Sequence, residues 1–191
     1  MKTKITTRQI AGVAIMTALV AALWAVSTFV PMKPFSINLA LLPIVIGACI
    51  YGPWWGFFLG AVDGFLIILD PATAGFLGAN VVATIFLCLL KTGLGGLASG
   101  FLFKLIHKKN DLIAAIAASL ILPIVNTGLF MLGSFIFFQD FLTSLGLTVV
   151  GISLTTNFVV EFIVAAVMSP VVYKLIKIAA KNRDIGSVYH N

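Results

Sequence analysis

Long apolar runs, separated by short polar or Gly-Pro breaks, occupy nearly the whole chain of 191 residues. Runs of about 20 apolar residues are typical of transmembrane helices, because a helix of that length crosses a hydrocarbon core about 30 Å thick. Sorting the chain by these runs predicts helices at 9–30, 37–51, 53–69, 76–105, 112–138 and 146–176. The division between the second and third rests on the Gly52-Pro53 turn. We therefore expect an all-α membrane protein, a single integral domain (1–191) formed by a bundle of six transmembrane helices.

The composition agrees with a protein that is surrounded by lipid. Apolar residues make up 61% of the chain and charged residues 9%, whereas a soluble domain carries roughly 25% charged residues. The formal net charge of +6 does not indicate nucleic-acid binding, because the basic residues stand at the ends of apolar runs and form no stripe suited to DNA or RNA. We expect no nucleic-acid partner.

The distribution of basic residues predicts how the helices are oriented. Cytoplasmic loops of membrane proteins are enriched in Lys and Arg, and an even number of spans places both termini on one side. With both termini cytoplasmic, the outside loops contain one basic residue, Lys33, together with Asp70 and Asp140. The inside ends then collect Lys2, Lys4, Arg8, Lys104, Lys108, Lys109, Lys174, Lys177, Lys181 and Arg183.

Small residues recur at intervals of four in three of the predicted helices. This spacing places them on one helix face, where another backbone can approach closely. The stripes are Ala14, Ala18 and Ala22; Gly52, Gly56, Gly60 and Gly64; and Thr92, Gly96 and Gly100. We expect the two glycine stripes to pack within the bundle, while the alanine stripe could instead bind a separate subunit.

Few polar side chains lie inside the apolar runs. A charge at the centre of a membrane helix costs roughly 2.5–3.5 kcal/mol on insertion scales, so each of these side chains is expected to have a structural or functional role. Asn80, Thr84 and Lys91 are spaced to share one helix face, and Asn157 and Glu161 are one turn apart. Lys91, Asn126 and Glu161 all fall near the middle of their helices. The pattern predicts a polar chamber that opens outward and has an ionic floor.

A structural interpretation of the same residues stays open. Lys91 could pair with Glu161 or Asp63 merely to neutralise both charges, and for Asp63 packing or pairing is favoured because it lies beside a glycine stripe. Aromatic residues could supply the apolar walls of a pocket; the candidates are Trp24, Phe29, Phe35 and Phe130.

The sequence does not indicate an enzyme. The histidines, His107 and His190, lie in basic segments predicted to be cytoplasmic, so neither is placed for chemistry within the bilayer, and we expect no metal site. The chain also lacks a phosphate-binding loop of the P-loop type, so ATP-driven transport would need another polypeptide.

Several stretches together resemble the substrate-binding S components of energy-coupling factor (ECF) vitamin transporters. The resemblance covers nearly the whole chain. It is carried by the stretch Ala14-Ile15-Met16-Thr17-Ala18, by the run Leu42-Pro43-Ile44-Val45-Ile46-Gly47-Ala48 followed by Tyr51-Gly52-Pro53, and by Pro123-Ile124-Val125-Asn126-Thr127-Gly128.

The resemblance implies a multi-pass protein of a prokaryotic plasma membrane that binds a small water-soluble vitamin with high affinity. Its partners would be a transmembrane coupling protein (EcfT), bound by the alanine face of the first helix, and two ATPase subunits that use ATP and Mg, while this chain itself needs no cofactor. The substrate-binding residues that it implies are Phe35 and Asn38 of the first loop with Asn80, Thr84, Lys91, Asn126, Phe130, Asn157 and Glu161.

The vitamin itself is left open. A buried lysine suits a carboxylate, which favours pantothenate, whereas Glu161 could accept a donor from pyridoxine, hydroxymethylpyrimidine or cobalamin, and riboflavin also fits the class. Two other functions compete with vitamin capture. One is an autonomous channel or ion-coupled carrier that uses Asp63, Lys91 and Glu161, and the other is a membrane scaffold that binds no ligand.

Overall fold

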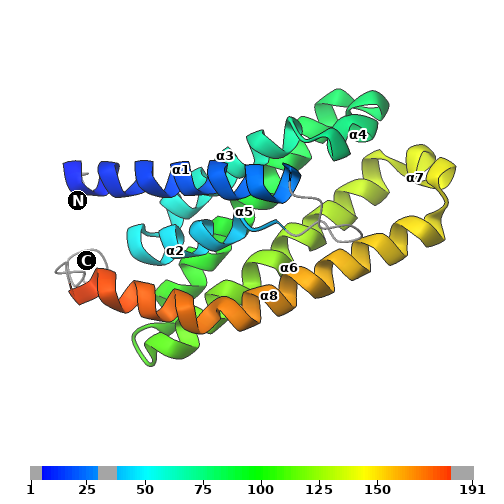
Figure 1. Cartoon of the computed structure of the whole chain (residues 1–191). Coiled ribbons are helices and arrows are strands. Elements are labelled where there is room, and N and C mark those ends of the chain that lie inside the picture. The colour runs from blue at the N-terminus through cyan, green and yellow to red at the C-terminus, as the bar shows by residue number, and fades with distance from the viewer. Residues whose placement is uncertain (1–5, 30–37, 182–191) are drawn as a thin grey trace.

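The computed structural model describes residues 6–29 and 38–181, and this part of the chain is helical with short turns and no strand. The six main helices are α1 (Thr7–Phe29), α2 (Leu41–Tyr51), α3 (Pro53–Ile68), α5 (Val81–Ile106), α6 (Asp111–Phe137) and α8 (Leu147–Lys181). Shorter pieces are η1 (Pro71–Thr73), α4 (Ala74–Ala79) and α7 (Gln139–Leu145). α1 begins and α8 ends at the same end of the bundle, and α4 and α7 lie at the other end (Figure 1). The predicted all-α bundle is confirmed.

Not every main helix is long enough to cross a bilayer. By length and composition, four stretches of the described chain qualify, at Gln9–Phe29, Val81–Ile106, Asp111–Phe137 and Gly151–Ala179. A fifth results if Pro53–Ile68 and Pro71–Ala79, which are bent by 73° to each other, form one span. α2 has 11 residues and is therefore about 16 Å long, shorter than the hydrocarbon core. The six helical segments exist, but the six spans and the side of the termini stay predictions.

The boundary between α2 and α3 lies where the sequence predicts it, at Gly52. This residue has φ 106° and ψ 170°, a conformation that strains any residue with a Cβ atom. Pro53 follows at the first position of α3, where its fixed φ suits a helix and its missing N–H leaves no donor unpaired. The Gly-Pro pair therefore ends one helix and begins the next.

The predicted helix at 76–105 is wrong in one respect, because the helix is interrupted at Asn80. This residue is extended, with φ −159° and ψ 100°, and its side-chain oxygen accepts a hydrogen bond of 3.1 Å from the Ala83 N–H. Asparagine is a strong N-cap because its side chain satisfies one of the unpaired N–H groups at a helix start. α5 consequently begins after Asn80, which does not share the helix face that carries Thr84 and Lys91.

The glycine stripes pack against each other between α3 and α5, as predicted. A Cβ atom on Gly60 would overlap the carbonyl of Thr92, and one on Gly56 would overlap the carbonyl of Gly96. The two backbones therefore approach as closely as their atoms allow. This contact fixes how α3 and α5 are rotated relative to each other, and so decides which of their polar side chains meet.

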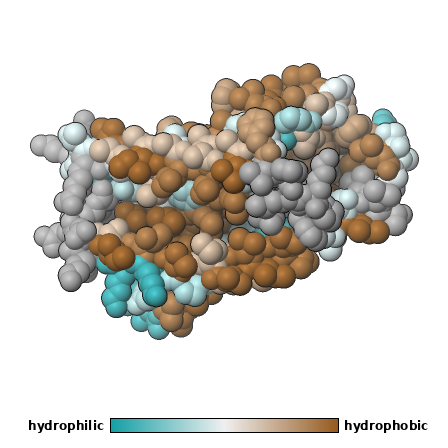
Figure 2. Space-filling model, viewed as in Figure 1, coloured by the Kyte–Doolittle hydropathy of each residue, from teal (hydrophilic) through white to brown (hydrophobic). Residues whose placement is uncertain are grey.

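The described bundle has an apolar interior and an apolar exterior. Ile44, Leu59 and Leu122 are completely buried in the core, while Val82, Leu105 and Ile136 are 79%, 73% and 68% exposed. Apolar side chains cover much of the surface along the middle of the molecule (Figure 2). Exposed apolar surface of this extent is typical of a protein whose solvent is lipid.

Candidate functional site

Asn38 ties the turn before α2 to the middle of α3. Its side-chain oxygen accepts a hydrogen bond of 3.0 Å from the Ala40 N–H, which fixes the turn that leads into the helix. Its Nδ2 donates a hydrogen bond of 3.0 Å to Asp63 Oδ2. Asp63 is completely buried. Because it lies three residues after Gly60 and one before Gly64, it stands beside the surface that packs closely on α5.

Lys91 of α5 lies among these groups without a direct ion pair. Its ammonium is 4.5 Å from the centroid of the Phe130 ring on α6, a cation–π contact. It interacts electrostatically with both Asp63 and Glu161. In the part of the chain that the structure describes, the ion pair within 4.0 Å is His107 with Asp111, at 3.7 Å, and it does not involve Lys91. The simple neutralising salt bridge is therefore not formed.

Glu161 of α8 connects the turn before α2 with α6. The backbone of Asn38 and the side chain of Asn126 lie next to its carboxylate, which also lies in the field of Lys91 and Asp63. We call Asn38, Asp63, Lys91, Asn126 and Glu161 the polar cluster. Its members come from five different segments and meet inside a bundle where polar groups are expensive.

Two acceptor atoms of the polar cluster have no hydrogen-bond partner among the described residues. They are Asp63 Oδ1 and Asn126 Oδ1, and Asn126 is 6% exposed. Buried polar atoms in native proteins are nearly always paired, so unpaired ones call for an explanation such as a ligand or a bound water.

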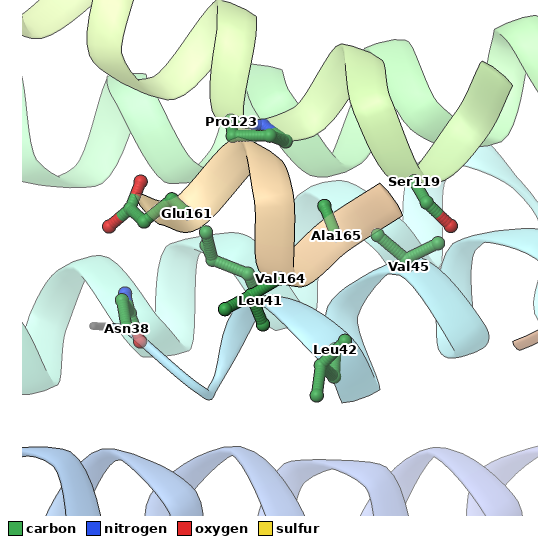
Figure 3. A pocket seen from close by; sticks show the side chains of 9 residues that line it. All are labelled: Asn38, Leu41, Leu42, Val45, Ser119, Pro123, Glu161, Val164 and Ala165. Carbon is green, nitrogen blue, oxygen red and sulfur yellow. The ribbon is translucent and has the colours of Figure 1, made fainter. Parts of the chain in front are cut away.

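A pocket between α2, α6 and α8 adjoins the polar cluster. Asn38 and Glu161 lie at one end of it, and the rest of its wall is mostly apolar (Figure 3). Its lining residues are Asn38, Leu41, Leu42, Val45, Ser119, Pro123, Glu161, Val164 and Ala165. Apolar walls with a few convergent polar groups are typical of small-molecule sites. Asp63, Lys91, Asn126 and Phe130 are not among its lining residues.

A family model described as "ECF transporter, substrate-specific component" matches residues 8–173, which includes all the described helices except the last turns of α8. The chain belongs to this family. The expected resemblance to ECF S components is thereby confirmed, and S components are substrate-binding transporter subunits and not enzymes. Searches of curated proteins and of solved structures returned no match to this S component.

Other residues predicted for the substrate site of this S component lie outside the polar cluster. Asn80 is exposed and caps α5, and the Thr84 hydroxyl donates hydrogen bonds of 2.7 Å and 2.8 Å to the carbonyls of Asn80 and Phe76. Asn157 is partly buried one turn before Glu161. Phe35 lies outside the described residues. For these four, a substrate contact stays a prediction.

Sequence reasoning favoured packing or pairing for Asp63 and did not single out the apolar lining of the pocket. Asp63 could have been found from its position, because an acid on the face of a glycine stripe is carried into the helix contact that the stripe forms. Leu41, Val45 and Val164 gave no such signal, since they resemble the other aliphatic residues of their helices.

The alanine stripe of the S component is free on the surface of α1. Ala14, Ala18 and Ala22 are exposed, whereas Val13 and Val20, on the opposite face, are buried. The stripe therefore takes no part in packing among the described helices. Family membership implies association with an ECF module, and an exposed small-residue face could receive a helix of that module.

Proposed function

We propose that this S component captures a small water-soluble vitamin with the polar cluster and the adjoining pocket, and delivers it through an ECF module. The convergence of five polar side chains from separate segments carries the proposal. Such groups are costly within a membrane protein, and two of the buried acceptors in the cluster have no hydrogen-bond partner among the described residues. A bound ligand would supply hydrogen-bond donors for these acceptors and would explain why the polar residues converge.

The partners in this proposal are a transmembrane coupling protein and two ATPase subunits. The exposed Ala14, Ala18 and Ala22 of α1 are the proposed contact for the coupling protein, because their lack of bulk permits close helix packing. ATP and Mg would be used by the ATPases, and this chain would need no cofactor of its own. The proposed location is the plasma membrane of a prokaryote, with both termini cytoplasmic.

The experiment that tests this function identifies the bound molecule. The chain is purified from membranes in mild detergent and analysed by native mass spectrometry, and we expect one vitamin to copurify and to rebind at sub-micromolar concentration. Asn126→Ala should weaken that binding at least tenfold, because Asn126 supports Glu161. Asn110→Ser, which keeps a capping side chain at the start of α6, should bind as the unaltered chain does.

A second function, an autonomous ion-coupled carrier, is favoured by the mutual electrostatic interaction of Asp63, Lys91 and Glu161. Three charged groups within one bundle are typical of a charge relay in transporters. Uptake into liposomes that contain this chain alone would support the carrier. Uptake that requires the coupling protein and both ATPases would instead support the S component.

A further inference from the structure

We infer that the substrate is an amine or a nitrogen heterocycle that donates hydrogen bonds and carries no carboxylate. This inference rests on the proposed function and specifies the chemistry of the same site. It replaces the preference for pantothenate, which depended on Lys91 considered apart from its neighbours.

The fully buried atoms of the polar cluster that lack a hydrogen-bond partner are both acceptors. Asp63 Oδ1 and Asn126 Oδ1 are both buried and lack a hydrogen-bond partner among the described residues. The nearby amide donor of Asn38 is already used by Asp63 Oδ2, at 3.0 Å. An acceptor is satisfied by a donor, so an N–H group complements these atoms, while a carboxylate would add two further acceptors.

The charge balance leads to the same chemistry. The polar cluster contains two carboxylates, Asp63 and Glu161, and one ammonium, Lys91, which interacts with both. Within the polar cluster itself, one ammonium group therefore lies in the neighbourhood of two carboxyl groups. A substrate carboxylate would add a third acid beside one ammonium in a site of low polarity, whereas an amine or a polarised N–H group would add a donor.

The position of the charges relative to the pocket supports this assignment. Glu161 lines the pocket beside Asn38, as Figure 3 shows, and Lys91 does not line it. The Lys91 ammonium instead lies over the Phe130 ring, 4.5 Å from its centroid. A ligand in the pocket between α2 and α8 therefore contacts the carboxyl group of Glu161, and none of the described residues that line the pocket is a lysine or an arginine.

The remaining wall of the pocket determines the shape of the ligand body. Leu41, Val45 and Val164 present aliphatic surface beyond the polar end. Such walls favour a small apolar or aromatic body with its donors gathered at one end. A substituted nitrogen ring combines these two properties in one small molecule.

A competitive binding experiment tests the inference. The purified full-length chain, stripped of bound molecules, is incubated with an equimolar pool of six probes and analysed by native mass spectrometry. Thiamine, hydroxymethylpyrimidine and pyridoxamine carry amino groups and no carboxylate, whereas pantothenate, biotin and nicotinate carry a carboxylate. We expect a probe of the first group to be retained. Retention of a carboxylate probe overturns the inference and leaves the proposed function intact, while retention of none, with no vitamin copurifying from membranes either, overturns both.

Charge-neutral variants provide the second readout. For the retained probe, Glu161→Gln should raise the dissociation constant at least tenfold, because the amide can no longer act as an ionised acceptor. Lys104→Gln, at the end of α5 away from the polar cluster, should leave it unchanged. Size-exclusion profiles establish that each variant is folded. A dissociation constant that is unaltered in Glu161→Gln but raised tenfold by Lys91→Gln would overturn the inference.

Discussion

The ammonium of Lys91 lies 4.5 Å from the centroid of the Phe130 ring, and within the described chain it has no carboxylate oxygen inside 4.0 Å. A partly buried lysine thus lies against an aromatic face and in the longer-range field of Asp63 and Glu161. This arrangement keeps the charge in the centre of the bundle without consuming the hydrogen-bonding capacity of either acid. It leaves those acids available to a ligand.

Replacing Phe130 by Leu should lower stability, because the aromatic face that stabilises the Lys91 ammonium is lost. A cation–π contact contributes about 0.5–2 kcal/mol, rising with its burial, so the midpoint of thermal unfolding in detergent should fall measurably. Phe137→Leu, at a side chain that is 50% exposed, is the matched control and should change the midpoint little. Equal midpoints for both variants would contradict a role for the ring.

Removal of the Asn38 side chain should destabilise the chain through Asp63. Asn38→Ala leaves Asp63 Oδ2 without the donor at 3.0 Å, and an unpaired buried acceptor costs about 1–3 kcal/mol. A double-mutant cycle with Asp63→Ala measures this contact by chemical unfolding in detergent. The two effects should be non-additive, because the residues share one hydrogen bond. Simple additivity would show that the hydrogen bond contributes nothing.

A methyl group at Gly60 should separate α3 from α5. A Cβ atom there would overlap the carbonyl of Thr92, and overpacking of this kind costs about 1–3 kcal/mol. Gly60→Ala should therefore unfold at a lower temperature and also bind ligand more weakly, because Asp63 would move with α3. The matched control is Gly128→Ala in α6, where a Cβ atom meets nothing within 4 Å. Similar behaviour of the two variants would exclude a tight contact at Gly60.

A bulky residue on the exposed face of α1 should separate binding from transport. Ala18→Trp should retain vitamin binding by the isolated chain, because Ala18 is exposed and remote from the polar cluster. Uptake by cells that express the complete ECF module should fall at least tenfold, since the coupling protein could no longer approach. Ala166→Trp on α8, also at an exposed position, should transport normally. Unimpaired uptake by Ala18→Trp would remove α1 from the proposed interface.

The sequence by itself determined the class of the protein and most of its helices. Apolar runs of sufficient length partition into lipid whatever their neighbours are, and Gly52-Pro53 ends and begins a helix through local backbone geometry. Glycine repeats likewise predict which face of a helix makes a close contact, but they do not predict which helix packs against that face. These features depend on residues near one another in the chain, and the structure agrees with them.

The tertiary structure decided which polar residues meet. Asn80 and Asn126 both lie in apolar surroundings in the sequence, yet one caps a helix and the other lies next to Glu161 inside the bundle. An asparagine suits either role, and the choice depends on whether the backbone breaks at that point. Asp63 joined the polar cluster because the glycine contact rotates α3 towards α5. Such relations depend on how helices pack across the whole bundle, and no local pattern specifies that packing.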